Sequence, residues 1–130
     1  MWEDEFNASL VACPEAMTCI EAIREHFAGA GNVEIHHTGT DNGDLRIWVT
    51  NGEGKSRNLF RLHFVRSGNY FSCNSYWLPG HLQLPLDGCL QNFRTTGDRL
   101  PNAFNLYPTM NGASARLVAA IEAAIAQWLA

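Results

Sequence analysis

The chain has 130 residues, of which 46% are hydrophobic and 17% are charged, and its formal net charge is −4. This composition is typical of one globular domain with a substantial hydrophobic core, and it argues against a disordered chain. Because Lys55 is the single lysine and the overall charge is acidic, we do not expect a surface that binds nucleic-acid phosphates.

The ends of the sequence and its cysteines exclude several further classes. The first five residues lack the basic flank and apolar run of a secretory signal, and the apolar segment near the end contains Glu122 and Gln127, so we expect a cytoplasmic protein without a membrane span. Cysteines at positions 13, 19, 73 and 89 show no C-x-x-C spacing, which predicts reduced, mostly buried thiols instead of a zinc site or disulfide framework. No phosphate loop, dinucleotide fingerprint or H-E-x-x-H motif is found, so no cofactor is expected.

The first predicted element is a helix over residues 13–28, where Pro14 suits the first turn. Apolar residues recur at helical spacing and should pack on the core: Ala16, Ile20, Ile23 and Phe27. Glu15, Glu21 and Glu25 would lie on the exposed side. We expect this acidic side either to be hydrated surface or to dock a basic protein partner.

Two strands are predicted next, over residues 33–37 and 45–50, with a turn rich in Gly, Asp and Asn between them. Apolar and polar residues alternate in both strands, which predicts one side facing the core and one polar side. The polar side would contain Glu34, His36, Arg46 and Trp48.

The aromatic-rich stretch from Arg57 to Trp77 predicts a hairpin with strands at 58–66 and 69–77. Its loop would be Ser67-Gly68, where the glycine tolerates the positive φ of such turns. This loop fixes the register, and directly opposite residues share a face. The core face would carry Phe64/Phe71, Leu62/Cys73 and Phe60/Ser75, and the polar face Val65/Tyr70, His63/Ser72, Arg61/Asn74 and Leu59/Tyr76.

Prolines interrupt the segment after residue 77, which predicts a mostly irregular region. Short strands are expected at 81–84 and 103–107, with a loop at 95–99 between them. A final helix with Asn111 or Ser114 as its cap is indicated by one apolar stripe: Leu117, Ile121, Ala124, Ile125 and Trp128.

These elements predict an α+β fold in a single domain over residues 1–130. We expect a four- to six-stranded antiparallel meander sheet, with the N-terminal and C-terminal helices packed on the face that carries Phe60, Leu62 and Phe64.

The polar face of this sheet is the candidate ligand site. Cationic, amide and hydroxyl groups converge there with aromatic rings, which suits a polar ligand that stacks and accepts hydrogen bonds. The predicted site residues are Arg46, Trp48, Arg61, His63, Tyr70, Ser72, Asn74 and Tyr76. Two alternatives are a hydrated sheet face without a ligand and a face covered by the segment after Trp77.

The function that these residues favour is a small binding domain for a polar or aromatic molecule. A protein-binding module is the alternative: an acidic inhibitor, an immunity-type protein or a homodimer subunit. A hydrolase-like enzyme is the second alternative, based on His63 opposite Ser72, but no acid is placed to orient the histidine. No metal site is expected, because Glu34, His36 and His63 belong to strands that are too far apart.

Overall fold

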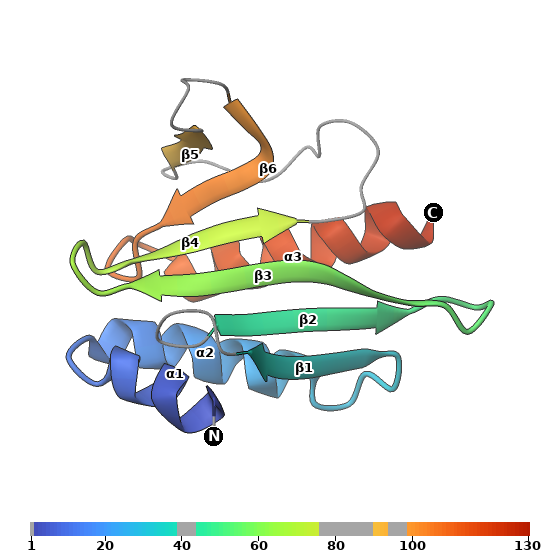
Figure 1. Cartoon of the computed structure of the whole chain (residues 1–130), viewed down its shortest axis with the longest axis horizontal. Helices are drawn as coiled ribbons and strands as arrows, with labels where there is room; N and C mark the ends of the chain where they lie inside the picture. Colours follow the sequence, from blue (N-terminus) through green and yellow to red (C-terminus); the bar gives the residue numbers. More distant parts are fainter. Residues whose placement is uncertain (1, 39–43, 76–89, 94–98) are drawn as a thin grey trace.

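An antiparallel sheet of six strands organises this protein, and a computed structural model describes residues 2–38, 44–75, 90–93 and 99–130 (Figure 1). The strands are β1 (Val33–Thr38), β2 (Asp44–Thr50), β3 (Ser56–Val65), β4 (Tyr70–Ser75), β5 (Leu90–Phe93) and β6 (Arg99–Leu106). Their order across the sheet is β1-β2-β3-β4-β6-β5. The first four therefore pair in sequence as the predicted meander, β6 continues it beside β4, and the α+β class is confirmed.

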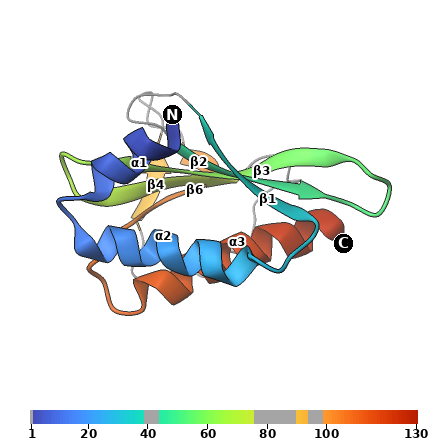
Figure 2. The same ribbon diagram turned by 90° about the horizontal axis from the view of Figure 1, so that it is seen from below.

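Three helices accompany the sheet: α1 (Trp2–Leu10), α2 (Pro14–Phe27) and α3 (Ala113–Leu129). Helices α2 and α3 lie side by side against one face of the sheet (Figure 2). Helix α1 was not predicted; it contacts α2, β1 and β2, and it fully buries Phe6 and Leu10. Within the described residues, none of the helices has the length and apolar character needed to cross a membrane.

The core lies between the helices and the sheet face that the sequence assigns to it. Phe60, Leu62 and Phe64 of β3 are at most 2% exposed, and the cross-strand partners Phe71 and Cys73 are fully buried. The apolar stripes of α2 and α3 belong to the same cluster of buried residues. The predicted core face of the hairpin is thus confirmed, because the register of a strand decides which face each side chain occupies.

The β3–β4 hairpin has the predicted register but a different loop. The pairs from Phe60/Ser75 to Val65/Tyr70 all match the prediction, while β3 ends at Val65 and β4 begins at Tyr70, which leaves a loop over residues 66–69. The positive φ, 52°, belongs to Asn69 and not to Gly68. The Tyr70 ring packs over Gly68: an added Cβ would lie 2.6 Å from its Cε1, so the ring would have to shift.

The prediction that Leu59 lies on the polar face is wrong. Leu59 is fully buried in the core cluster, next to the equally buried Phe60. The cause is an irregularity in the β2–β3 ladder, where Ile47 pairs with Phe60 and Trp48 pairs with Asn58. One extra residue on β3 breaks the alternation of period two at this point.

The C-terminal half agrees with the prediction in outline. Strand β6 covers residues 103–106 of the strand expected at 103–107 but starts earlier, and strand β5 was not predicted. The strand expected at 81–84 lies outside the described residues, as does most of the loop expected at 95–99. Neither Asn111 nor Ser114 caps α3 with its side chain. The residue before the helix is Gly112, whose φ of 72° is a left-handed conformation that glycine adopts without strain.

Candidate functional site

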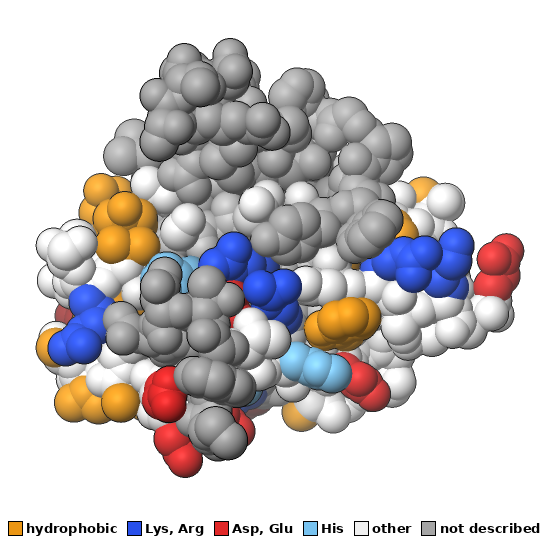
Figure 3. Space-filling view, viewed as in Figure 1, with side chains coloured by type: hydrophobic (Ala, Val, Ile, Leu, Met, Phe, Trp, Pro, Cys, Tyr) orange, Lys and Arg blue, Asp and Glu red, His pale blue; other side chains and the backbone are white. Residues whose placement is uncertain are grey.

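The polar sheet face, opposite the helices, contains a continuous row of nitrogen-bearing side chains. His36, Arg46, Arg61 and Asn74 are consecutive Cα partners across β1, β2, β3 and β4. Figure 3 shows basic side chains gathered at the centre of this face. Like charges directly opposite each other destabilise a sheet, so Arg46 and Arg61 need an anionic partner.

That partner is Asp44, the first residue of β2, which the sequence analysis did not include in the site. Its carboxylate is 0% exposed and accepts a hydrogen bond from Arg61 Nε at 2.7 Å. Arg46 contacts the same carboxylate through Nε and Nη2, both at 3.4 Å, and Thr38 donates its hydroxyl to Oδ1. Asp44 therefore fixes both guanidinium groups on the face of the sheet.

The ionised form of Asp44 is favoured by its surroundings. Burial by itself raises the pKa of this carboxyl group, but hydrogen bonds from Thr38 and Arg46, together with the charges of Arg46 and Arg61, outweigh burial and lower the pKa overall. The side chains of Arg46 and Arg61 are 24% and 29% exposed, so the guanidinium groups still reach the surface. The cluster combines a buried anion with accessible cations.

A second polar row lies beside the first. His63 pairs with Ser72 as predicted, and Ser72 pairs with Asn105 of β6. Asn105 was not predicted as a site residue, and its Oδ1 is buried without a hydrogen-bond partner. A buried amide oxygen of this kind is an acceptor that a ligand or water can satisfy.

Aromatic rings flank the two rows at opposite ends of the strands. Trp48 stands two residues beyond Arg46 on β2, and its ring centroid lies 5.6 Å from that of His36. At the other end, the ring centroids of Tyr70 and Tyr107 are 5.5 Å apart. Of the two tyrosines predicted at the site, Tyr70 lies on this face, and Tyr76 lies outside the described residues.

Seven of the eight predicted site residues can therefore be located, and the register assigns all seven to one face: Arg46, Trp48, Arg61, His63, Tyr70, Ser72 and Asn74. The sequence does contain a signal for Asp44, because it extends the alternation of Arg46 and Trp48 by one step. Asn105 required the strand order, since the chain alone does not indicate that β6 pairs with β4. No cluster of three metal-ligating side chains occurs in the part of the chain that the structure describes.

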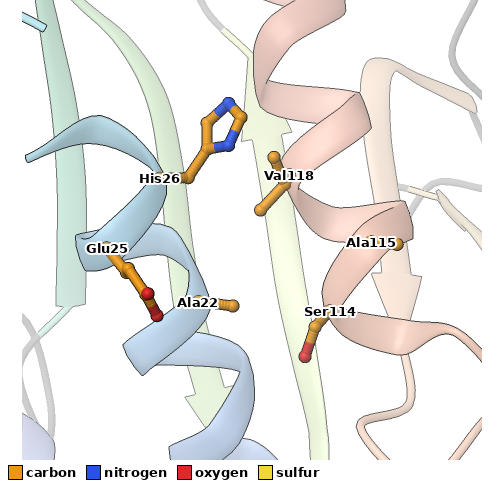
Figure 4. Close-up of a pocket in the computed structure, with 6 residues that line it drawn as sticks. All are labelled: Ala22, Glu25, His26, Ser114, Ala115 and Val118. Atoms are coloured by element: carbon orange, nitrogen blue, oxygen red, sulfur yellow. The ribbon is translucent and has the colours of Figure 1, made fainter. Parts of the chain in front are cut away.

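A separate groove lies between α2 and α3, on the side of the helices away from the sheet (Figure 4). Its volume is about 410 Å³, and small side chains line it: Ala22, Ser114 and Ala115, together with Val118, Glu25 and His26. His26 bridges the two helices, with Nε2 at 2.9 Å from Glu122 Oε1.

Below the groove, the Ser114 hydroxyl donates to Cys19 Sγ at 3.6 Å. Burial raises the pKa of the Cys19 thiol, the hydrogen bond from Ser114 opposes that effect, and the neighbouring Cys13 adds to it. Cys13, Cys19 and Cys73 are all buried. These thiols are poorly suited to reaction, since a reactive cysteine needs an accessible thiolate.

No protein-family model, curated protein or solved structure matches this chain.

Proposed function

We propose that this protein is a small binding domain whose ligand, a polar molecule with an aromatic or other flat group, binds on the polar sheet face. The observation that supports this most strongly is the buried carboxylate of Asp44, which holds Arg46 and Arg61 in fixed positions. The carboxylate offsets the repulsion between the two opposed arginines, and both guanidinium groups still reach the surface. Fixed donors that reach the surface are what a binding site requires.

The remaining groups give the site its directionality. Trp48 offers a flat ring for stacking, while Ser72 and Asn74 provide donors and acceptors on the same face. Because these groups lie on paired strands and not on loops, the ligand meets them already ordered. Preordered contacts improve affinity by lowering the entropy lost on binding.

The test is a fragment titration followed by NMR, with the indole N–H of Trp48 and the backbone amides of β2 to β4 as probes. We expect several polar aromatic fragments to shift these signals, and we expect Trp48→Leu to weaken their binding. Trp128→Leu is the matched control, because Trp128 belongs to α3 in the other layer. If no fragment shifts the signals and the chain instead forms a concentration-dependent dimer that protects Tyr70, the face is a subunit interface and the proposal is wrong.

A second candidate, a protein-binding module, is supported by the groove between α2 and α3. Its small side chains leave space for an incoming side-chain ridge, and Glu25 and the nearby Glu122 give it an acidic border. A second cavity of about 420 Å³ shares Ser114 and Ala115 with it and extends to Glu15. Charge complementarity favours a basic amphipathic helix as the partner.

A synthetic amphipathic helix of lysine and leucine tests this candidate by fluorescence anisotropy. We expect salt-sensitive binding that Ala115→Leu abolishes by filling the groove, whereas Ala8→Leu, at an exposed position on α1, leaves it unchanged. Equal binding by both variants would show that the peptide binds elsewhere.

A further inference from the structure

We infer that the ligand of the polar face carries an oxyanion, a carboxylate or phosphate group, and that Arg46 binds this group. The inference rests on the proposed function, because it specifies the ligand class of the same site. The two arginines contact Asp44 at unequal distances.

Asp44 is bonded more closely to Arg61 than to Arg46. The contact from Arg61 Nε is 2.7 Å, a length typical of a charge-assisted hydrogen bond, whereas both contacts from Arg46 are 3.4 Å. Oδ1 of Asp44 also accepts a hydrogen bond from the Thr38 hydroxyl. The better hydrogen bond of Arg46 is to the Thr38 hydroxyl, which is uncharged, at 3.0 Å. Arg46 thus lies farther from the carboxylate oxygens of Asp44 than Arg61 does, and its shortest contact is with an uncharged group.

Arg46 has a donor group that neither Asp44 nor Thr38 uses. Its contacts with these two residues are made by Nε and Nη2, and Nη1 takes no part in them. The side chain is 24% exposed, so the guanidinium group reaches the surface. A guanidinium presents its N–H groups in a planar fork that matches carboxylate and phosphate oxygens, and lysine cannot reproduce this fork.

The neighbours of Arg46 favour a ligand whose oxyanion is attached to a flat body. His36 is its direct partner on β1, and Trp48 lies on the same strand and face with its ring against His36. An oxyanion at Arg46 would place an attached ring beside Trp48. The ligand class is therefore an aromatic or otherwise planar carboxylate or phosphate ester.

The test compares matched probes by NMR titration: benzoate with benzamide, and phenyl phosphate with inorganic phosphate. Benzoate and benzamide have the same shape and differ in charge. We expect benzoate or phenyl phosphate to bind at least about 10-fold more tightly than benzamide, since a charged hydrogen bond adds about 1.4 kcal/mol or more. The stronger of the two anions identifies the group, and binding of inorganic phosphate alone would show that the ring contributes little.

One variant and a matched control examine the role of Arg46. Arg46→Gln should weaken anion binding at least about 10-fold, the equivalent of about 1.4 kcal/mol, and leave benzamide binding unaffected. Arg66→Gln, which removes the same charge from an exposed loop position, should change neither.

The outcomes separate this inference from the proposed function. If benzamide binds as well as benzoate and Arg46→Gln changes nothing, the site binds neutral ligands and the oxyanion inference is overturned while the proposed function stands. If none of the probes shifts Trp48, and the fragment titration also finds no ligand, both are overturned.

Discussion

Replacing Asp44 with asparagine examines the most unusual feature of the molecule, a fully buried carboxylate under two arginines. Asparagine keeps the size and an acceptor for Thr38, so the variant removes the charge and little else. The charge-assisted bond from Arg61 at 2.7 Å should dominate the loss, with a smaller part from the 3.4 Å contacts of Arg46. A hydrogen bond to a charged group contributes about 1.5–3 kcal/mol, and water can reach both partly exposed guanidinium groups, so we expect the free energy of unfolding to fall by about 2–3 kcal/mol.

The assay is urea denaturation at several pH values, with Glu53→Gln as the control because Glu53 is an exposed carboxylate on a turn. The pKa of Asp44 is lower in the folded protein than in the unfolded chain, so the native state binds fewer protons. Its stabilising contribution is complete above the unfolded value of about 3.9 and is lost as the pH falls through the lower folded pKa. The difference between wild type and Asp44→Asn should therefore be full at neutral pH and shrink below about pH 4.

Two results would refute this reasoning. A difference in unfolding free energy below about 0.5 kcal/mol at neutral pH, which is the range of ordinary surface substitutions, would mean that Asp44 is not a buried partner of the arginines. A difference that persists unchanged in acid, while both proteins remain folded, would mean that the effect comes from packing and not from the charge.

Three further changes examine the core, the hairpin loop and the contact between α1 and β1. Leu62→Ala should lower the free energy of unfolding by about 2–5 kcal/mol in urea denaturation because it opens a cavity in the core, whereas Leu62→Met should cost less than about 1.5 kcal/mol. Gly68→Ala should displace the Tyr70 ring and change the near-UV circular dichroism, because the new Cβ would lie 2.6 Å from Cε1; Gly52→Ala, with open space around it, should not. Burial is the largest influence on His37 and lowers its pKa, so the free energy of unfolding of the wild type should fall as the pH drops below about 6.5. If the urea midpoint of His37→Leu falls equally steeply over that range, His37 is not the cause.

The β3–β4 hairpin was predictable from the sequence because its signals are local. Alternation of apolar and polar side chains decides which residues share a face, and the turn between the strands decides which residues lie opposite each other. The pairs Leu62/Cys73 and His63/Ser72 follow from these two facts, although the loop is longer than predicted. The predicted loop, residues 67–68, and the observed loop, residues 66–69, have the same midpoint, so the same residues lie opposite each other in both.

The apolar stripes of α2 and α3 were predictable for a similar reason, since a period of 3.6 residues is visible in the sequence. Helix α1 was not predicted, because its nine residues include acidic and polar side chains that do not indicate an amphipathic helix by themselves. Its burial of Phe6 against His37 depends on the position of β1, which is a tertiary contact.

Only the tertiary structure decided the chemistry of the candidate site. The alternation in the sequence assigns Asp44 and Arg61 to the polar face, but it does not show that they meet. Their contact at 2.7 Å depends on the pairing of β2 with β3. The extra residue at Leu59 has no periodic signature, since a bulge interrupts the very pattern used to predict strands. The approach of Asn105 to Ser72 depends on which strand pairs with β4, a choice made by long-range packing. The sequence thus determined which side chains face away from the core, and the fold determined which of them meet.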